Sequence, residues 1–293
     1  MNQCFEKIVI AWCWLSTFLL ITAVGVVIGF LVIKGGSALN LKLIFGDTAP
    51  LDALLLRRAV FDGLFPAIIG TLLLVLLAIL MAAPVGILTG IYMAEYASLS
   101  VKKRFGFFFD ILAGLPSIVV GLFGLAIVIF LHKYISAHVY PCLFLSAMTL
   151  AFLVLPYLIR STQGALEALP NTIRRTAPAL GASRVQNLFL ILLPRARDGI
   201  LNGVILSIGR CAEDTAVIML TGAVAMAGVP RSVFENYEAL PFYIYYISSQ
   251  YADQQELLSG YAAAIILLCL CGLLFMSALY VNYNFRRGAM NRV

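Results

Sequence analysis

The chain has 293 residues, of which 62% are hydrophobic and 12% charged, and its mean hydropathy is +0.99. Because about a quarter of the residues in an ordinary soluble domain are charged, this composition excludes a soluble globular protein and indicates one integral membrane domain, residues 1–293. The formal net charge of +6 comes with no nucleic-acid-binding motif and is explained by basic loops, so we expect no nucleic-acid partner.

Six segments are apolar enough to form membrane-spanning helices, because a helix needs about 20 apolar residues to cross the bilayer core. The first segment is too long for the apolar core of a signal peptide, and we expect it to remain as an uncleaved anchor. The predicted spans cover residues 8–33, 64–93, 107–131, 140–159, 199–226 and 260–283. The sequence therefore predicts an all-α membrane protein with six transmembrane helices in contact with lipid.

Lysines and arginines are unevenly distributed between the two sets of loops. If both termini are cytoplasmic, thirteen of the 20 basic residues lie on the inner side, and Arg210 lies within the fifth span. The inner residues are Lys7, Lys102, Lys103, Arg104, Arg160, Arg174, Arg175, Arg184, Arg195, Arg197, Arg286, Arg287 and Arg292. Because basic residues concentrate in cytoplasmic loops, we expect both termini in the cytoplasm.

Motifs for catalysis, metal binding and ATP binding are missing from the sequence. The six cysteines form no CxxC pair and have no histidine at metal-ligand spacing, so we interpret them as small apolar side chains. No GxxxxGK[ST] motif and no nucleophile–base–acid arrangement occur either. We therefore expect no catalytic residue, metal or cofactor in this chain, and any ATP that drives it must be hydrolysed by another chain.

One predicted inner loop, residues 160–198, is too long for a simple connection between two helices. A short helix is expected to begin in the sequence Pro-Asn-Thr at 170–172 and to end at Gly181. Ser183 is expected to cap a second, amphipathic helix that ends just before Pro194. Such a helix–turn–helix on the inner membrane face is typical of a docking element, and a helix lying on the lipid surface is the alternative.

The sequence ALGAS, followed by an apolar stretch and LLP, resembles the EAA-type loop of importer permeases of the ATP-binding-cassette class. The resemblance implies a coupling helix that docks into a groove of a cytoplasmic ATPase subunit. Gly181 and Pro194 occupy the glycine and proline positions of that loop. Ala177 occupies its second alanine, and Arg175 stands in place of its glutamate. The residues assigned to ATPase coupling are Arg175, Ala177, Ala179, Gly181 and Pro194.

Two further stretches resemble the phosphate-specific Pst permeases. They are LFPAIIGTLLLVLLAILMAAPVGILTGIYMAEYA at 64–97 and DILAGLPSIVVGLFG at 110–124. The EYA sequence and the short amino terminus are similar to the A-type transmembrane subunit of this family. The resemblance implies the MetI-like fold of type I importers, with the coupling loop on the cytoplasmic side.

The family also implies a function and a set of partners. A Pst permease imports inorganic phosphate across the bacterial inner membrane, together with a second Pst-type permease, two ATPase subunits and an extracytoplasmic phosphate-binding protein. ATP and magnesium would bind to the ATPase subunits. A permease for another oxyanion or small nutrient is the alternative within this class. A secondary transporter or a membrane scaffold is the alternative outside it, although we find no convincing internal repeat of the kind typical of secondary transporters.

The fifth predicted span carries charges where lipid-facing helices have none. Its sequence at 210–215 resembles the family form R-A-I-G-E-T, with Arg210 at the arginine and Thr215 at the threonine. Asp214 stands in place of the glutamate, and Glu213 takes the glycine position. Residues three and four apart share a helix face, so Arg210 is expected to meet both acids. Either Arg210 attracts phosphate while an acid holds its guanidinium, or the charges form an ion pair that only locks helices together.

The third predicted span contains a polar break at 114–117. Pro116 is expected to leave the carbonyl of Leu112 without its helical hydrogen bond. Ser117 is therefore a candidate to line the transport path, and close helix packing around small residues is the alternative. The candidate path residues are Arg210, Glu213, Asp214, Thr215 and Ser117.

Overall fold

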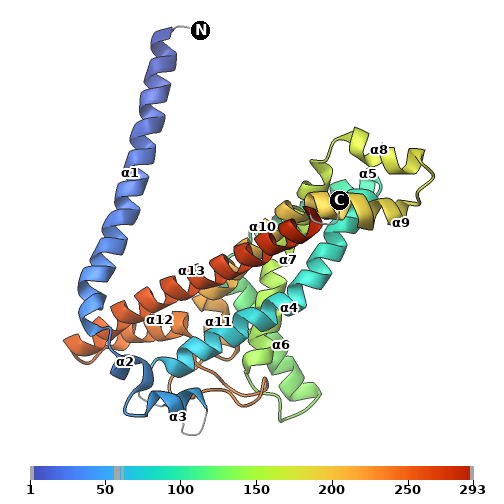
Figure 1. Ribbon diagram of the computed structural model, residues 1–293. Coiled ribbons are helices and arrows are strands. Elements are labelled where there is room, and N and C mark those ends of the chain that lie inside the picture. Colours follow the sequence, from blue (N-terminus) through green and yellow to red (C-terminus); the bar gives the residue numbers. More distant parts are fainter. Residues whose placement is uncertain (1–2, 56–59, 61–62, 291–293) are drawn as a thin grey trace.

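The computed structural model describes residues 3–55, 60 and 63–290, and these residues fold mostly into helices (Figure 1). Five of their helices are long and apolar enough to cross a membrane. In the part of the chain that the structure describes, β pairing is limited to one isolated bridge between Ala223 and Tyr237. The prediction of an all-α membrane protein is confirmed.

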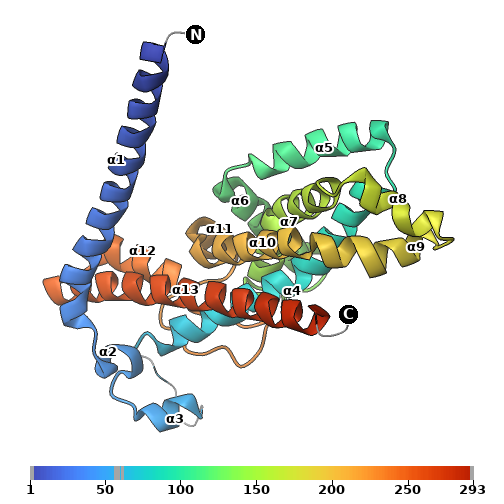
Figure 2. The same ribbon diagram turned by 45° about the horizontal axis from the view of Figure 1, so that its top comes forward.

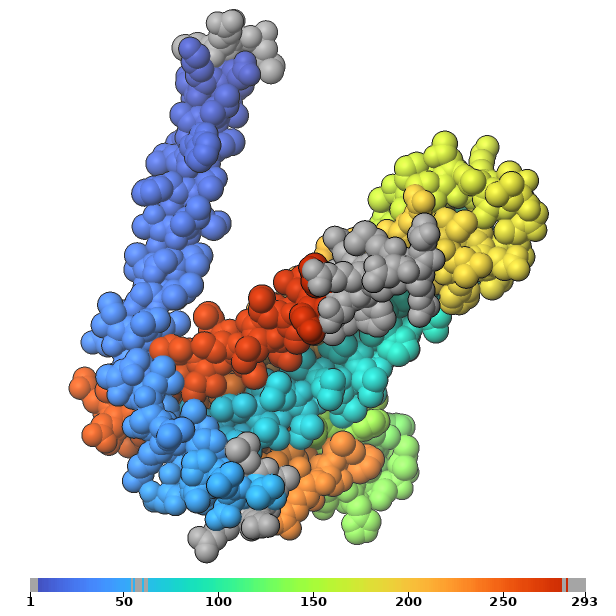
Figure 3. Space-filling view, in the orientation of Figure 1, coloured from blue at the N-terminus to red at the C-terminus, as the bar shows by residue number. Residues whose placement is uncertain are grey.

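Helix α1, Gln3–Gly35, projects away from the other helices (Figure 1, Figure 3). The carboxyl end of α1 contacts the first turns of α13, Gln254–Met290. At this contact the ring of Phe30 lies edge-on to that of Tyr261, with centroids 5.6 Å apart. A Cβ on Gly35 would lie 2.7 Å from the backbone of Tyr261, so glycine permits the close approach. Most described side chains of α1 are exposed and apolar, as expected for a helix in lipid.

The centre of the bundle is the pair formed by α4, Phe65–Glu95, and α7, Leu143–Glu167. A Cβ on Gly86 of α4 would lie 2.6 Å from the Cβ of Leu158, and a Cβ on Gly90 would lie 2.6 Å from that of Thr162. Small residues allow membrane helices to approach this closely. The two helices therefore form one tightly packed unit, called below the α4–α7 unit.

The third predicted span is two helices in the structure. Helix α5, Leu99–Ala113, and helix α6, Ser117–Tyr134, are separated by the break at 114–116. The carbonyl of Leu112 accepts a 3.3 Å hydrogen bond from the amide of Leu115. This carbonyl therefore lacks its helical hydrogen bond, as expected, and a turn bond replaces it, because the chain turns at the proline instead of continuing as a kinked helix.

The inner loop and the fifth predicted span also differ from expectation. The elements are α8 at Asn171–Ala179, α9 at Arg184–Asn187, a π-helical turn at Leu188–Leu192, α10 at Leu193–Glu213 and α11 at Thr215–Thr221. The second loop helix does not stop before Pro194. It continues through the π turn into α10, and Pro194 lies in the first turn of α10, where its missing N–H is tolerated. Residues 199–226 are not one helix, because Asp214 separates α10 from α11.

The segments assigned to the two sides of the membrane gather at opposite ends of the molecule. Helices α8 and α9 lie at one end, with the carboxyl ends of α4 and α7 and the start of α5 (Figure 1, Figure 2). The other end holds a 3-10 turn at Gly36–Ala38, α2 at Leu41–Phe45, α3 at Pro50–Leu54 and α12 at Leu240–Gln250. This grouping agrees with the loops predicted to share a side, and the side that each end faces stays a prediction.

Candidate substrate path and coupling loop

Arg210 lies in the last turn of α10, and its side chain is exposed. Its Nη2 donates a 3.0 Å hydrogen bond to the hydroxyl of Tyr157 in α7. The guanidinium carbon also lies 5.0 Å from the centroid of the Tyr157 ring, and the face of an aromatic ring attracts a cation. A neutral tyrosine therefore orients the arginine.

The acids next to Arg210 do not hold it as predicted. Within the described residues, Arg210 forms no ion pair with Glu213 or Asp214. The side chain of Asp214 is buried and accepts a 2.9 Å hydrogen bond from the amide of Val217, so it caps α11. The predicted shared helix face holds for Arg210 and Glu213, which both lie in α10, but it is wrong for Asp214, because the helix ends at Glu213 and the chain turns at Asp214.

A hollow of about 320 Å³ lies beside Arg210. Its lining residues are Asn202, Ile205, Leu206, Gly209, Arg210, Glu213 and Phe275. The exposed Glu213 therefore shares the wall of this hollow with Arg210, without an ion pair between them. Asn202, Arg210 and Glu213 gather here within a segment predicted to span the membrane, which makes this hollow the candidate substrate site.

Tyr157 also connects Arg210 to the break between α5 and α6. Its hydroxyl donates a 3.0 Å hydrogen bond to the carbonyl oxygen of Ala113, the last residue of α5. The same hydroxyl thus accepts a hydrogen bond from α10 and donates one to α5. Three helices meet at this tyrosine, and Ser117 begins α6 directly after the break.

Two further candidate path residues lie at the starts of neighbouring helices. Helices α6 and α11 pack side by side and run parallel. Gly121 and Gly124 of α6 face Val217 and Thr221 of α11, respectively. In this register Ser117 lies level with residues 213–214, one to two residues before Thr215, and Ser117 and Thr215 are both half-buried. The structure therefore places Ser117 and Thr215 at the helix starts that follow the Tyr157 junction and the Asp214 cap.

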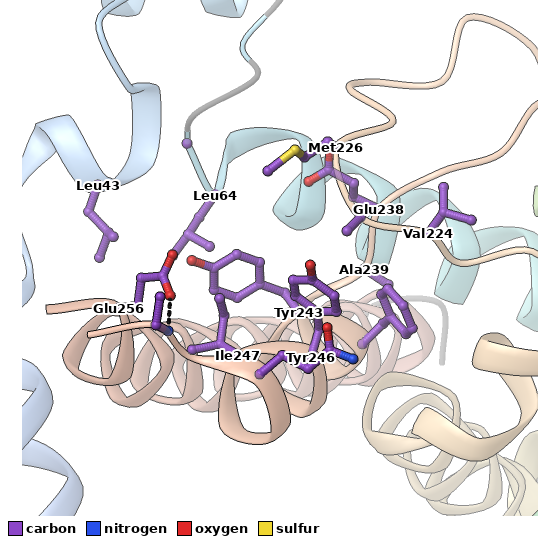
Figure 4. Close-up of a pocket in the computed structure, with 15 residues that line it drawn as sticks. Leu43, Leu64, Val224, Met226, Glu238, Ala239, Tyr243, Tyr246, Ile247 and Glu256 are labelled. Carbon is purple, nitrogen blue, oxygen red and sulfur yellow. Dashed lines mark hydrogen bonds between the residues drawn. The ribbon is translucent and has the colours of Figure 1, made fainter. Parts of the chain in front are cut away.

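A second cavity, of about 330 Å³, lies at the other end of the molecule, beside α12 (Figure 4). Tyr243 and Tyr246 of α12 lie between Glu238 and Glu256. Glu238 accepts a 2.7 Å hydrogen bond from the amide of Gly228, and its burial raises the pKa of its carboxyl group. Among the described residues that line this cavity, none is a lysine, arginine or histidine. Its acidic wall is therefore unsuited to a phosphate ion.

The coupling loop has the turn and the cap that its sequence predicts. Gly181 has φ of +88°, a left-handed conformation that favours glycine, and it follows the end of α8. The Ser183 Oγ accepts a 3.2 Å hydrogen bond from the amide of Gln186. The Gln186 side chain in turn accepts a 2.8 Å hydrogen bond from the amide of Ser183. This capping box starts α9 as expected.

The other coupling candidates differ in exposure. Arg175, Ala179 and Pro194 are exposed, whereas Ala177 is buried. Leu180, just before the turn, is 85% exposed, and Phe189 and Leu190 of the π turn are also exposed. The loop therefore presents apolar side chains at the end of the molecule, where a partner protein could cover them.

Among the residues that the structure describes, three ion pairs connect the helices at this end. They are Arg174–Glu95 at 2.6 Å, between α8 and α4, Lys102–Glu167 at 2.7 Å, between α5 and α7, and Arg160–Asp110 at 2.6 Å, between α7 and α5. The sequence did not reveal these partners, since Glu95 and Arg174 are 79 residues apart. Tyr157 was missed for the same reason, although a tyrosine directly after Pro156 in an apolar helix was an available signal.

Comparisons with known proteins agree with this architecture. A family model described as "Binding-protein-dependent transport system inner membrane component" matches residues 86–287. The phosphate transport system permease protein PstA of Haemophilus influenzae is 33% identical over 244 residues, which are 82% of this chain and 81% of that protein.

Two solved structures share the fold. A chain of the bacterial alginate ABC transporter, solved in complex with an alginate pentasaccharide-bound periplasmic protein, is 17% identical with a TM-score of 0.64, covering 97% of this chain and 98% of that one. A chain of the MetNI methionine ABC transporter in an inward-facing conformation is 18% identical with a TM-score of 0.54, covering 80% and 97%. The prediction of a MetI-like importer fold is confirmed.

Proposed function

The chain belongs to the PstA family of phosphate transport permeases, among the binding-protein-dependent inner membrane components, and on this basis we propose how its structure works. It is a permease subunit of an ABC-type phosphate importer and is not itself an enzyme. We assign ATP and magnesium binding to cytoplasmic ATPase subunits, because this chain has no phosphate-binding loop motif.

We infer that phosphate passes Arg210. The observation that carries this proposal is an exposed guanidinium held by the neutral Tyr157, with no carboxylate paired to it among the described residues. A charge in a membrane protein is costly unless it faces water or a partner, and the fork of N–H donors of an arginine suits an oxyanion. Ser117 and Thr215 would supply hydroxyl donors along the same path.

Transport also requires that the site release the ion, so its binding must be weak. Glu213 lies on the wall of the hollow beside Arg210 and would repel an anion. Asp214 would act indirectly, by ending α10 and fixing the start of α11. Helix α6 starts without a side-chain cap, so its first N–H groups add positive potential to the path.

We propose that the loop formed by α8 and α9 docks into a groove of the ATPase. Leu180 and Phe189 are exposed apolar side chains that such a groove would cover. Arg175 replaces the glutamate of the family motif and is exposed, so an ion pair at this position would need a carboxylate on the ATPase. The end of the molecule with this loop, and both chain termini, would then face the cytoplasm.

The opposite end, with α12, would meet an extracytoplasmic phosphate-binding protein, and a second Pst-type permease would complete the path. The continuous rod of α9, the π turn and α10 runs from the coupling loop to Arg210. When ATP closes the ATPase pair, movement of the loop would therefore reach the arginine directly. The π turn interrupts the regular helix geometry, so any bend between α9 and α10 would occur there.

Reconstitution tests this function. Vesicles containing this chain, its partner permease and both ATPase subunits should take up phosphate only with ATP and the loaded binding protein. Sulfate, offered through the same binding protein or through its own, serves as the comparison oxyanion. Transport of sulfate in preference to phosphate would contradict the assignment.

A further inference from the structure

The side chain of Arg174 in α8 makes three hydrogen bonds to groups outside α8 and α9. Its Nη1 donates a 2.6 Å hydrogen bond to Glu95 Oε1, at the end of α4. Its Nη2 donates to the carbonyl oxygen of Leu166, and its Nε donates to that of Leu169 at 3.4 Å. One side chain of the loop therefore reaches both helices of the α4–α7 unit.

The pair between Arg174 and Glu95 is shielded from solvent. The two side chains are 20% and 17% exposed, whereas the other ion pairs of this end include partners that are 42% and 63% exposed. Shielding strengthens the attraction between the charges and makes the loss of either partner costly. This pair is therefore the firmest polar connection between the loop and the bundle.

Helix α8 otherwise packs mainly against α9 and the π turn, which belong to the same loop. Ile173 adds apolar contact with the cluster around Leu166, so the loop stays attached even without the ion pair. The side-chain Nδ2 of Asn187 donates a 3.0 Å hydrogen bond to the backbone carbonyl oxygen of Arg174, which fixes Arg174 to α9. Arg174 thus lies where the loop and the α4–α7 unit join.

The α4–α7 unit extends from this junction to the candidate substrate site. Tyr157, which holds Arg210, directly precedes Leu158, the residue that packs against Gly86 of α4. A displacement of the unit therefore displaces the hydroxyl that orients Arg210. The rod of α9 and α10 carries Arg210 itself, so the two connections from the loop converge on the same contact.

We propose that Arg174 is a positioning residue for energy coupling: by clamping α8 to Glu95 and to the end of α7, it makes the α4–α7 unit move with the coupling loop. This inference rests on the proposed transport function and extends it, because it assigns the direct connection between α8 and the α4–α7 unit to one ion pair, beside the packing of α10 against α7. Without the ion pair, α8 still docks and ATP is still hydrolysed. Tyr157 no longer moves with the loop, however, and less phosphate is carried for each ATP hydrolysed.

The test measures phosphate carried per ATP hydrolysed by reconstituted complexes. The variants are Arg174→Gln, Glu95→Ala, the double variant, Arg174→Lys and, as control, Arg104→Gln. Arg104 is an exposed arginine at the same end of the molecule, and no hydrogen bond or ion pair of its side chain is found among the described residues. Co-purification of the ATPase is measured in parallel, because it reports docking separately from coupling.

Coupling between sites commonly amounts to changes of about 5- to 150-fold, so Arg174→Gln and Glu95→Ala should each lower the ratio by about fivefold or more while the ATPase still co-purifies. The double variant should be no worse than either single variant, because both remove one interaction. Arg174→Lys keeps the charge but not the fork, and should recover part of the ratio. Arg104→Gln should match the unmodified complex.

An unchanged ratio in assembled Arg174→Gln and Glu95→Ala complexes would overturn the inference. A double variant whose ratio falls by the product of the two single losses would also overturn it, since Arg174 and Glu95 would then have separate roles. Failure of both single variants to assemble would also overturn it, because the pair would then be only structural. If the unmodified complex carries no phosphate, the transport assignment fails first, independently of Arg174.

Discussion

The guanidinium of Arg210 and the hydroxyl of Tyr157 are 3.0 Å apart, and the same hydroxyl donates to the backbone of Ala113. The arginine that the sequence places in a membrane segment is thus held by a neutral partner from another helix. An oxyanion that approaches Arg210 meets its full positive charge, which an ion pair would have reduced.

The hydroxyl of Tyr157 should matter for transport. Tyr157→Phe keeps the ring under the guanidinium but removes both hydrogen bonds. A hydrogen bond contributes about 1 kcal/mol, so uptake should be about fivefold slower. Initial rates of phosphate uptake by complexes of equal subunit content measure this. Tyr157→Leu, which also removes the ring, should be slower still, and equal rates for all three proteins would contradict the role of Tyr157.

Asp214 should behave as a helix cap and not as the counter-charge of Arg210. Asparagine also caps helices, so Asp214→Asn should keep the thermal stability of the purified complex, whereas Asp214→Ala should lose about 1 kcal/mol. Melting curves in detergent distinguish the two variants. A large destabilisation by Asp214→Asn that Arg210→Gln relieves would instead indicate a hidden ion pair.

Gly181 should be replaceable only by residues that accept a left-handed backbone. A Cβ at this position meets nothing within 4 Å, so any penalty comes from the backbone and not from a clash. Asparagine tolerates this conformation, whereas a β-branched residue is strained there by about 1–2 kcal/mol. Co-purification of the ATPase should therefore survive Gly181→Asn and decline with Gly181→Val. Equal docking by both variants would show that the turn is not needed.

The assigned orientation predicts which positions react with a membrane-impermeant thiol reagent. In a variant without the natural cysteines, single cysteines at 235–255 should be labelled from outside intact cells. Cysteines at 102–104 and 174–184 should react only after the membrane is opened. Labelling of the second group from outside would reverse the topology and remove the docking loop from the cytoplasm.

Features that depend on a few neighbouring residues could be predicted from the sequence. The turn at Gly181 and the cap at Ser183 depend on one glycine and on a Ser-x-x-Gln box, so their geometry is local. Family membership came from resemblance to known sequences, which local rules do not supply, and the path through Arg210 is a proposal that rests on the same resemblance. The apolar runs predicted the long helices, because a helix that crosses the bilayer core needs about 20 consecutive apolar residues.

Other features depend on contacts between distant segments. The prediction that Arg210 shares a face with Asp214 assumed an unbroken helix. Asp214 followed by Thr215 also fits a cap and a helix start, and the structure has this second arrangement. Pro194 fits either a helix end or a first turn, and packing of the loop decided for the second. No local rule pairs Arg174 with Glu95, because tertiary structure alone brings them together.

The central claim is that phosphate is carried past Arg210 by this permease. The most direct measurement is ATP-driven phosphate uptake by vesicles that contain Arg210→Gln in an otherwise unmodified complex, with subunit content and ATPase co-purification determined on the same sample. Glutamine removes the positive charge but keeps a side chain of similar polarity. We expect an assembled complex that docks its ATPase and carries almost no phosphate. Uptake at the unmodified rate would contradict it.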